Sequence, residues 1–317
     1  MIERQTGASL RALLLVATAF VLIAGVQLFV LSEQSATFFA WTASSPLTAG
    51  FLGAGYFASA VLELLTWRER VWAYTRIAVP SLCVFVCLTL LMTLLDLDCF
   101  HFASDNPVTL GATWAWLIIY ATIPFALLAA LWRQRNLPGT DPPRAQPLPL
   151  ALRALLALQA TVMLGLGIVI WAFPPAAERL WFWRVMEMET RAIAAWLMGL
   201  GVAAAHVVCE NDARRARDAF VSYGVLALLQ WVAWLRYAAG VEWTGAGSGL
   251  YIVAWLSVAL VSAWGLQAGM SRPPVGPASY YPIGTSAIPR NRSRCARARP
   301  SAARRPTRGS ETTTKKA

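Results

Sequence analysis

Long apolar runs, separated by short polar segments, dominate the pattern of this chain. Residues 12–31 and 108–132 contain no charged side chain. A bilayer core of about 30 Å is crossed by roughly 20 helical residues, so such runs predict membrane-spanning helices. The fold class expected is all-α, a polytopic membrane protein with eight transmembrane helices. The predicted spans cover residues 10–31, 47–66, 77–95, 108–132, 152–173, 192–208, 220–236 and 250–270.

The apolar pattern of residues 11–132 recurs in residues 153–270, and several polar or aromatic positions recur with it. The matched pairs are Arg11 with Arg153, Trp41 with Trp183, Thr48 with Thr190, Arg76 with Arg217, and Ser81 with Ser222. Each copy holds an even number of spans, so both copies enter the membrane in the same sense. The sequence therefore predicts two parallel four-helix repeats. Because the first span has a counterpart in the second copy, we interpret it as a span and not as a signal peptide.

The repeat sets the predicted domain organisation. Between the copies, Pro138-Gly139 and Pro142-Pro143 interrupt any helix, as expected for a linker. The predicted parts are the first membrane repeat (1–133), a cytoplasmic linker (134–150), the second membrane repeat (151–271) and a disordered basic tail (272–317).

Composition and charge support the membrane assignment and orient it. Hydrophobic residues make up 57% of the chain and charged residues 14%, against about 25% charged in a typical soluble domain. With the N-terminus in the cytoplasm, most Arg residues fall in inner loops. The exceptions, in predicted outer loops, are Arg179, Arg184, Arg191 and Arg236. The positive-inside rule then predicts that both termini are cytoplasmic.

The tail has its own composition, rich in Pro, Ser, Thr and Arg with Glu311 as its one acid. Such a segment lacks the apolar residues that form a core, so we expect it to be disordered. Near an anionic leaflet each basic residue contributes about 1 kcal/mol of attraction. Membrane lipids with anionic headgroups are therefore the expected partners, whereas nucleic acid is unlikely because no nucleic-acid-binding module is recognisable.

Two ionisable residues lie inside predicted spans, where charge is costly and function is the first question. Glu63 and His206 occupy the second helix of each copy, one position apart in the repeat. Both are near the cytoplasmic ends of their helices, where a side chain can reach water. His206 also has Glu210 four residues on, a helical neighbour. We favour structural contacts at the helix ends; a proton relay or substrate site is the alternative.

The outer loops offer a second set of candidates. Trp41 and Trp183 belong to aromatic clusters, and Thr48 and Thr190 follow each Trp at the same spacing, placed to cap the next helix. An interfacial aromatic belt with helix caps explains this pattern; a pair of ligand-binding loops is the alternative. His101 aligns with Glu242 in the repeat, and we expect His101 to be simply solvated.

Motifs for cofactors and catalysis are not found. The two His lie on opposite sides of the predicted membrane, and no Cys-x-x-Cys or His-x-x-x-His spacing suits a metal. A P-loop and a Gly-x-Ser-x-Gly elbow are missing. We therefore expect no metal, no cofactor and a non-enzymatic role, as a scaffold or a small-molecule or lipid carrier. The alternative is a membrane enzyme acting at the outer face through Asp96, Asp98, His101, Glu187, Glu189 or Glu242.

One resemblance can be stated from residues 180–183, 190–196 and 210–212, which read Leu-Trp-Phe-Trp, Thr-Arg-Ala-Ile-Ala-Ala-Trp and Glu-Asn-Asp. This run resembles a group of uncharacterised multi-spanning membrane proteins from high-GC Gram-positive bacteria. The first copy keeps only Trp41 and Thr48 of the pattern, and the tail is not part of it. The resemblance implies a location in the bacterial cell (inner) membrane and no particular activity.

Overall fold

Helices are the regular elements of this computed structural model, which describes residues 2–177, 181, 183–240 and 246–270. The long helices are α1 (Ala8–Gly25), its π-helical continuation η1 (Val26–Val30), α3 (Pro46–Arg68), α5 (Ala78–Leu95), α6 (Pro107–Arg135), α7 (Leu150–Ala172), α9 (Glu187–Glu210), α10 (Arg217–Arg236) and α11 (Ala246–Met270). Short elements are η2 (Ser32–Gln34), α2 (Ser35–Phe38), α4 (Trp72–Thr75), η3 (Leu97–Cys99) and η4 (Ala238–Gly240). The predicted tail, 272–317, lies outside the described residues.

The described part of the chain contains 8 helices long and apolar enough to cross a membrane. This confirms an all-helical fold in the described part of the chain and supports the prediction of eight membrane spans. The bounds differ most for α9, which runs from Glu187 to Glu210 where residues 192–208 were predicted. The difference arises because the first turn of α9 contains Glu187 and Glu189 and its last residue is Glu210. Polar residues such as these end an apolar run in the sequence but do not end the helix.

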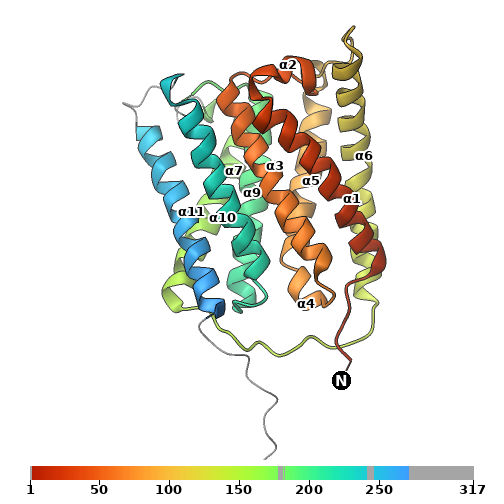
Figure 1. The fold of residues 1–317 in the computed structure, drawn as a ribbon, viewed down its shortest axis with the longest axis vertical. Coiled ribbons are helices and arrows are strands. Elements are labelled where there is room, and N and C mark those ends of the chain that lie inside the picture. Colours follow the sequence, from red (N-terminus) through yellow and green to blue (C-terminus); the bar gives the residue numbers. More distant parts are fainter. Residues whose placement is uncertain (1, 178–180, 182, 241–245, 271–317) are drawn as a thin grey trace, which may run out of the picture. The chain divides into compact units, whose positions relative to one another are not determined.

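The helices pack across the sequence halves (Figure 1). α3 packs against α1 and α10, whereas α9 packs against α7 and α5. The third long helix of each half therefore lies on the second long helix of the other half. α3 is the most buried span, with 78% of its apolar window inside the protein, so it forms the centre of the helical unit.

Small residues allow these close approaches. Gly50 of α3 faces Ala233 of α10, and Gly199 of α9 faces Phe85 and the Ser81 carbonyl of α5. Both glycines belong to stripes of small residues four positions apart, which permit helix backbones to approach: Gly50, Ala54 and Ala58 in α3, and Ala195, Gly199 and Ala203 in α9. The tightest contact is elsewhere: a Cβ on Gly53 would lie 2.4 Å from the backbone nitrogen of Phe29, in the π-helical turn of α1.

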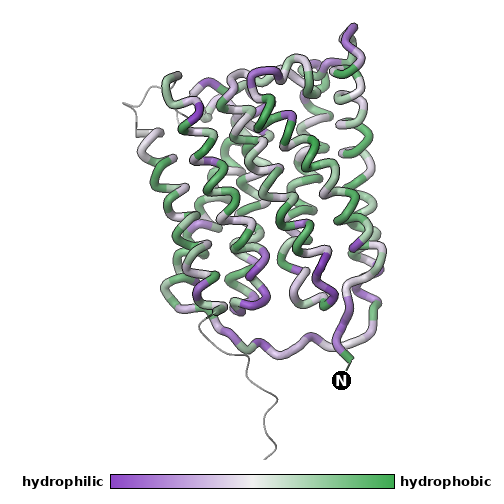
Figure 2. Tube along the Cα trace, in the orientation of Figure 1, coloured by the Kyte–Doolittle hydropathy of each residue, from purple (hydrophilic) through white to green (hydrophobic). Residues whose placement is uncertain are grey.

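One end of the helical unit, here named the linker end, carries the N-terminal segment, α4 and the segment 136–149 between α6 and α7 (Figure 1). Polar residues gather along these segments (Figure 2). Arg4 donates its backbone N–H to the Thr140 carbonyl at 3.0 Å and accepts from Trp72 N at 2.9 Å. The N-terminal segment thus lies between the linker and the loop before α4. The opposite end is named the α2 end.

Candidate functional site

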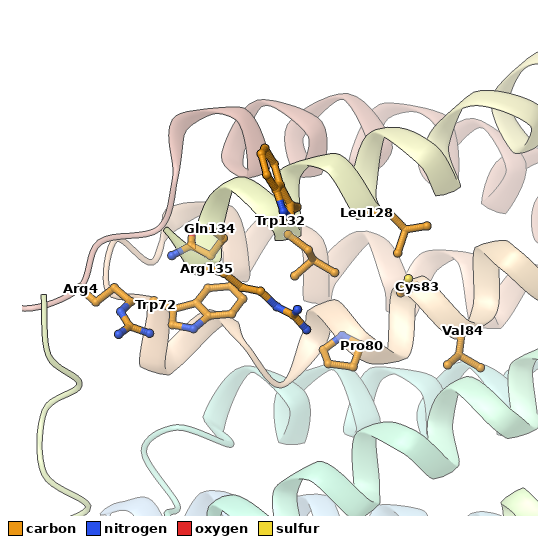
Figure 3. A pocket seen from close by; sticks show the side chains of 10 residues that line it. Arg4, Trp72, Pro80, Cys83, Val84, Leu128, Trp132, Gln134 and Arg135 are labelled. Atoms are coloured by element: carbon orange, nitrogen blue, oxygen red, sulfur yellow. The ribbon is translucent and has the colours of Figure 1, made fainter. Parts of the chain in front are cut away.

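A groove of about 580 Å³ lies between α5 and α6 at the linker end (Figure 3). Its lining side chains are Arg4, Trp72, Pro80, Cys83, Val84, Leu128, Leu131, Trp132, Gln134 and Arg135. Figure 3 shows Arg4, Trp72 and Arg135 together at one end, and Cys83, Val84 and Leu128 at the other. The groove is therefore cationic and aromatic at one end and apolar along the rest.

The backbone around Arg4 fixes its place in this groove. Gly139 has φ of 120°, and a Cβ there would lie 2.6 Å from Arg4 N, so the linker approaches this closely only with glycine. The Arg4 guanidinium reaches the Gly139 carbonyl through Nη2 at a long 3.4 Å. Its Nε is buried and has no hydrogen-bond partner. An unpaired buried donor of this kind costs free energy until an acceptor meets it.

Gln134 and Arg135 are adjacent on α6 but differ in burial and in their partners. Gln134 is buried, accepts from Gly7 N at 2.7 Å and donates to the Gln5 carbonyl at 3.0 Å, which attaches the N-terminal segment to α6. Arg135 is exposed and belongs to no ion pair among the described residues. The groove thus contains a charged group that forms no ion pair with a carboxylate of the described residues. Sequence reasoning missed this site, because Arg4 and Arg135 meet only in the folded chain.

Glu63 lies inside the protein instead of reaching water at the helix end. Its side chain is 3% exposed, Ser59 Oγ donates to Oε1 at 3.0 Å, and Oε2 has no partner. Thr18 of α1 is the second hydroxyl beside the carboxyl group. The expected snorkelling to the helix end is therefore not seen for this residue.

His206 does make the expected helical contact, with Nε2 at 3.7 Å from Glu210 Oε1. No hydrogen bond or ion pair joins His206 to Glu63, although both are within the described residues. The two intramembrane candidates are thus separate features, and His206 belongs to a larger cluster around Glu210.

Glu210, at the end of α9, is the centre of that cluster. It is 4% exposed and lies 2.6 Å from Arg76 Nη2, 2.7 Å from Arg215 Nη1 and 3.6 Å from Arg144 Nε. Arg76 also binds Asp141 at 2.5 Å. Burial alone would lower the pKa of Arg76, but the hydrogen bonds and charges of Glu210 and Asp141 outweigh it and raise that pKa. This cluster attaches α9, the loop before α5 and the linker to one another.

The next two residues hold the linker directly. Asn211 ends α9 in the left-handed conformation, with φ of 48°, and its side chain accepts from Leu148 N at 3.2 Å. Asp212 accepts from Ala145 N at 2.8 Å and from Gln146 N at 3.0 Å. The Glu-Asn-Asp run noted in the sequence is therefore an anchor for the linker.

At the α2 end the two tryptophan loops meet side chains of the packed interior. Trp183 Nε1 donates to Thr48 Oγ1 at 2.9 Å, a bond that joins the two sequence halves. Trp41 is 1% exposed and stacks edge-to-face with Phe39, Phe100 and Trp116, while its Nε1 has no partner. The equivalent bond from Trp41 to Thr190 is not made, so the copies differ here.

The helix caps also differ from the prediction. Ser45 Oγ, and not Thr48, caps α3 by accepting from Thr48 N at 3.1 Å, and Pro46 occupies the first turn. Thr190 is buried in the first turn of α9, where Glu189 reaches back to Met186 N at 3.0 Å. The prediction that Thr48 and Thr190 cap these helices was therefore wrong. The free N–H groups are met instead by Ser45 Oγ in α3 and by the Glu189 carboxylate in α9.

The acidic residues of the α2 end are engaged in structural contacts. Asp96 pairs with Arg191 at 2.5 Å, and Glu187 lies 3.7 Å from the same guanidinium. Glu189 is fully buried and accepts from Ser44 N at 2.8 Å. Their partners are Arg191 in the first turn of α9 and Ser44 just before α3, so these carboxylates hold helix ends in place. This geometry gives the enzyme alternative no support.

The other outer-loop candidates are also accounted for. His101 Nε2 lies 3.1 Å from Thr42 Oγ1, so this ring has a partner in the segment between α2 and α3, where solvation alone was expected. Asp98 is exposed on η3, and Glu242 lies outside the described residues. In the part of the chain that the structure describes, no group of three or more His, Cys, Asp or Glu is arranged to hold a metal ion.

Comparison of this chain with protein-family models, with curated proteins and with solved structures finds no match. The groove between α5 and α6 must therefore be interpreted from its own chemistry.

Proposed function

We propose that this is a non-enzymatic protein of the bacterial cell membrane that binds an anionic phospholipid in the groove between α5 and α6. The observation that carries the proposal is the cationic end of the groove, where Arg4 Nε is buried without a hydrogen-bond partner and Arg135 has no ion pair among the described residues. The rest of the groove is apolar. A phosphodiester supplies the oxygen acceptors and the negative charge that these guanidinium groups need.

The rest of the groove suits a lipid. A volume of about 580 Å³ holds a headgroup and part of an acyl chain, and Cys83, Val84 and Leu128 provide the apolar contact for that chain. Trp72 and Trp132 suit the interfacial depth, where amphipathic rings are favoured. Basic pockets between membrane helices on the cytoplasmic side are suited to anionic headgroups. Of the roles expected from the sequence, a scaffold or a small-molecule or lipid carrier, the groove favours one that binds lipid.

The centre of the protein favours a scaffold over a carrier that moves solutes between the halves. The cavity between α3, α5, α9 and α10 is about 50 Å³, lined by small and aromatic residues such as Gly55, Ala58, Phe85, Trp196 and Gly199. That space holds a few water molecules at most. A solute path through this centre would need the helices to separate.

The finer architecture belongs to the same proposal: two parallel four-helix repeats with both termini in the cytoplasm. Reciprocal packing of α3 with α10 and of α9 with α5 supports the repeat, because a two-fold axis along the membrane normal would generate that exchange. The linker end is then cytoplasmic, which places the groove at the inner leaflet. The basic tail, 272–317, supplies further anionic headgroup contacts.

Loss of the groove arginines tests the lipid site. In the double variant Arg4→Gln/Arg135→Gln, binding of phosphatidylglycerol should weaken at least about tenfold. One charge-assisted hydrogen bond is worth about 1.5–3 kcal/mol, and 1.4 kcal/mol corresponds to tenfold. Native mass spectrometry of the purified protein, titrated with phosphatidylglycerol and with phosphatidylcholine, measures the change.

The matched control is Arg133→Gln, on the same helix but outside the groove lining. It removes a basic residue at the same membrane depth and should leave phosphatidylglycerol binding within about twofold of the unmodified protein, because exposed charges contribute little. Equal weakening in the control and the double variant would show attraction by general positive charge and would overturn the site.

The proposed orientation predicts the labelling of single-cysteine variants in intact cells. A membrane-impermeant maleimide should modify a protein that retains only Cys99, since Cys99 is exposed at the α2 end. A protein that retains only Cys295, in the predicted cytoplasmic tail, should react only after the cells are opened. Partial burial and the charges of Asp96 and Asp98 raise the pKa of the Cys99 thiol, so its labelling should quicken as pH rises. The reverse pattern of access would place the termini outside.

A further inference from the structure

Glu63 is a carboxyl group buried in the membrane-spanning part of the protein, away from the lipid groove. It sits on α3, the most buried span, and only 3% of its surface is exposed. Ser59 Oγ donates to Oε1 at 3.0 Å, and Oε2 has no hydrogen-bond partner. An ionised carboxylate placed there would be costly without a cation or further donors.

The hydroxyl groups around Glu63 define which form of the carboxyl group they suit. Thr18 Oγ1 donates its single hydrogen to the Leu14 carbonyl at 2.8 Å. With its hydrogen on the Leu14 carbonyl, Thr18 supplies no donor to Oε2 of Glu63. Ser59 uses its hydrogen on Oε1. The carboxyl group thus has one donor, on Oε1, and none on Oε2, which suits the neutral acid better than the carboxylate.

The neighbouring helices supply no cation to Glu63. No ion pair among the described residues includes it. The titratable side chain that faces it from α6 is Tyr120, whose hydroxyl lies 2.9 Å from that of Tyr56 on α3. Charged groups of the other adjacent helices are engaged elsewhere: Arg11 of α1 with the Trp67 carbonyl, His206 of α9 with Glu210, and Asp218 of α10 with Arg217.

We propose that Glu63 is a proton-binding site, with the proton on Oε2 and with Oε1 accepting from Ser59. Ser59 also lines the cavity of about 50 Å³ between α3, α5, α9 and α10, together with Ser81 and Ser222. That cavity is large enough for water, which needs roughly 10–15 Å³. Water there would contact Ser59, which donates to the carboxyl group. The site is independent of lipid binding.

Infrared spectroscopy of the full-length protein in lipid vesicles tests the proposal. At neutral pH the unmodified protein should show a carboxylic-acid C=O stretch that is lost in Glu63→Gln. The band should shift when glutamate is labelled with ¹³C, an observation that needs no variant. Dicyclohexylcarbodiimide, which reacts with protonated carboxyl groups in apolar surroundings, should modify Glu63. Glu189→Gln is the matched control, because that buried carboxylate accepts from two backbone N–H groups and should leave the band unchanged.

Two results would overturn the proposal. The first is a spectrum without any Glu63-dependent or ¹³C-sensitive acid band at neutral pH, which would show an ionised carboxylate. The second is a band that disappears on addition of Na⁺ at constant pH, which would make Glu63 a cation ligand. Phosphatidylglycerol binding is expected to be the same in Glu63→Gln and the unmodified protein, so failure here leaves the lipid site standing.

Discussion

Replacement of Glu210 by glutamine is expected to lower the free energy of unfolding by about 3 kcal/mol or more. The variant leaves the guanidinium groups of Arg76 and Arg215 without their shared carboxylate, and loss of one partner of a buried ion pair typically costs about 3–5 kcal/mol. Arg215 is the critical member, because its side chain is only 4% exposed. Arg76 keeps Asp141 as a partner, which limits the loss. Denaturant unfolding in detergent micelles, followed by Trp fluorescence, measures the change.

The control for this prediction is Glu187→Gln at the other end of the same helix. Glu187 lies 3.7 Å from Arg191, but its side chain is 67% exposed, so solvent screens the pair and the expected loss is below about 1 kcal/mol. If both variants unfold at the same denaturant concentration, the cluster around Glu210 does not stabilise the linker end.

Substitution of Gly53 by alanine should be the second large effect, with a loss of about 1–3 kcal/mol. The added methyl group would lie 2.4 Å from Phe29 N and 2.8 Å from the Leu28 carbonyl carbon. These are backbone atoms of the π-helical turn, which cannot rotate away as a side chain does. α1 and α3 must therefore separate, which opens the contact that is closest among the glycine positions of the described helices. Thermal unfolding in detergent measures the loss as a lower midpoint.

Gly111→Ala is the matched control, since Gly111 lies within α6 and no atom lies within 4 Å of an added Cβ. There the same change should stabilise the helix by about 0.5–1 kcal/mol, because alanine loses less conformational freedom than glycine. Opposite signs for the two variants are the expected result. Destabilisation of similar size in both would show that helix propensity, and not the contact with Phe29, governs Gly53.

Local patterns in the sequence were sufficient for the helices and for contacts within one helix. The uncharged runs 12–31 and 108–132 predicted spans that are present, and the spacing of His206 and Glu210 predicted a contact that is present at 3.7 Å. Helix caps were less secure: Ser45 caps α3 where Thr48 was expected, because both hydroxyls lie within one turn and only the backbone path selects between them.

Contacts between distant segments had no comparable signal. Arg76 and Glu210 are 134 positions apart, and Trp183 and Thr48 are 135 apart. The sequence around each of these residues gives no indication of its distant partner. The same is true of Arg4, which becomes part of a groove only because Gly139 lets the linker pass close to the N-terminal segment.

The sequence by itself determined the membrane class, the number of spans and the acidic, basic and aromatic character of each helix end. These follow from hydropathy and helical spacing, which act over a few turns of one segment. The tertiary structure alone decided that α3 packs on α10 and α9 on α5, so that each half contacts the other. It also decided that Glu63 is buried and that Arg4 and Arg135 line the same groove. Apolar spans are interchangeable in a lipid solvent, so their neighbours are selected by close packing and by polar bonds between distant residues, which no local pattern records.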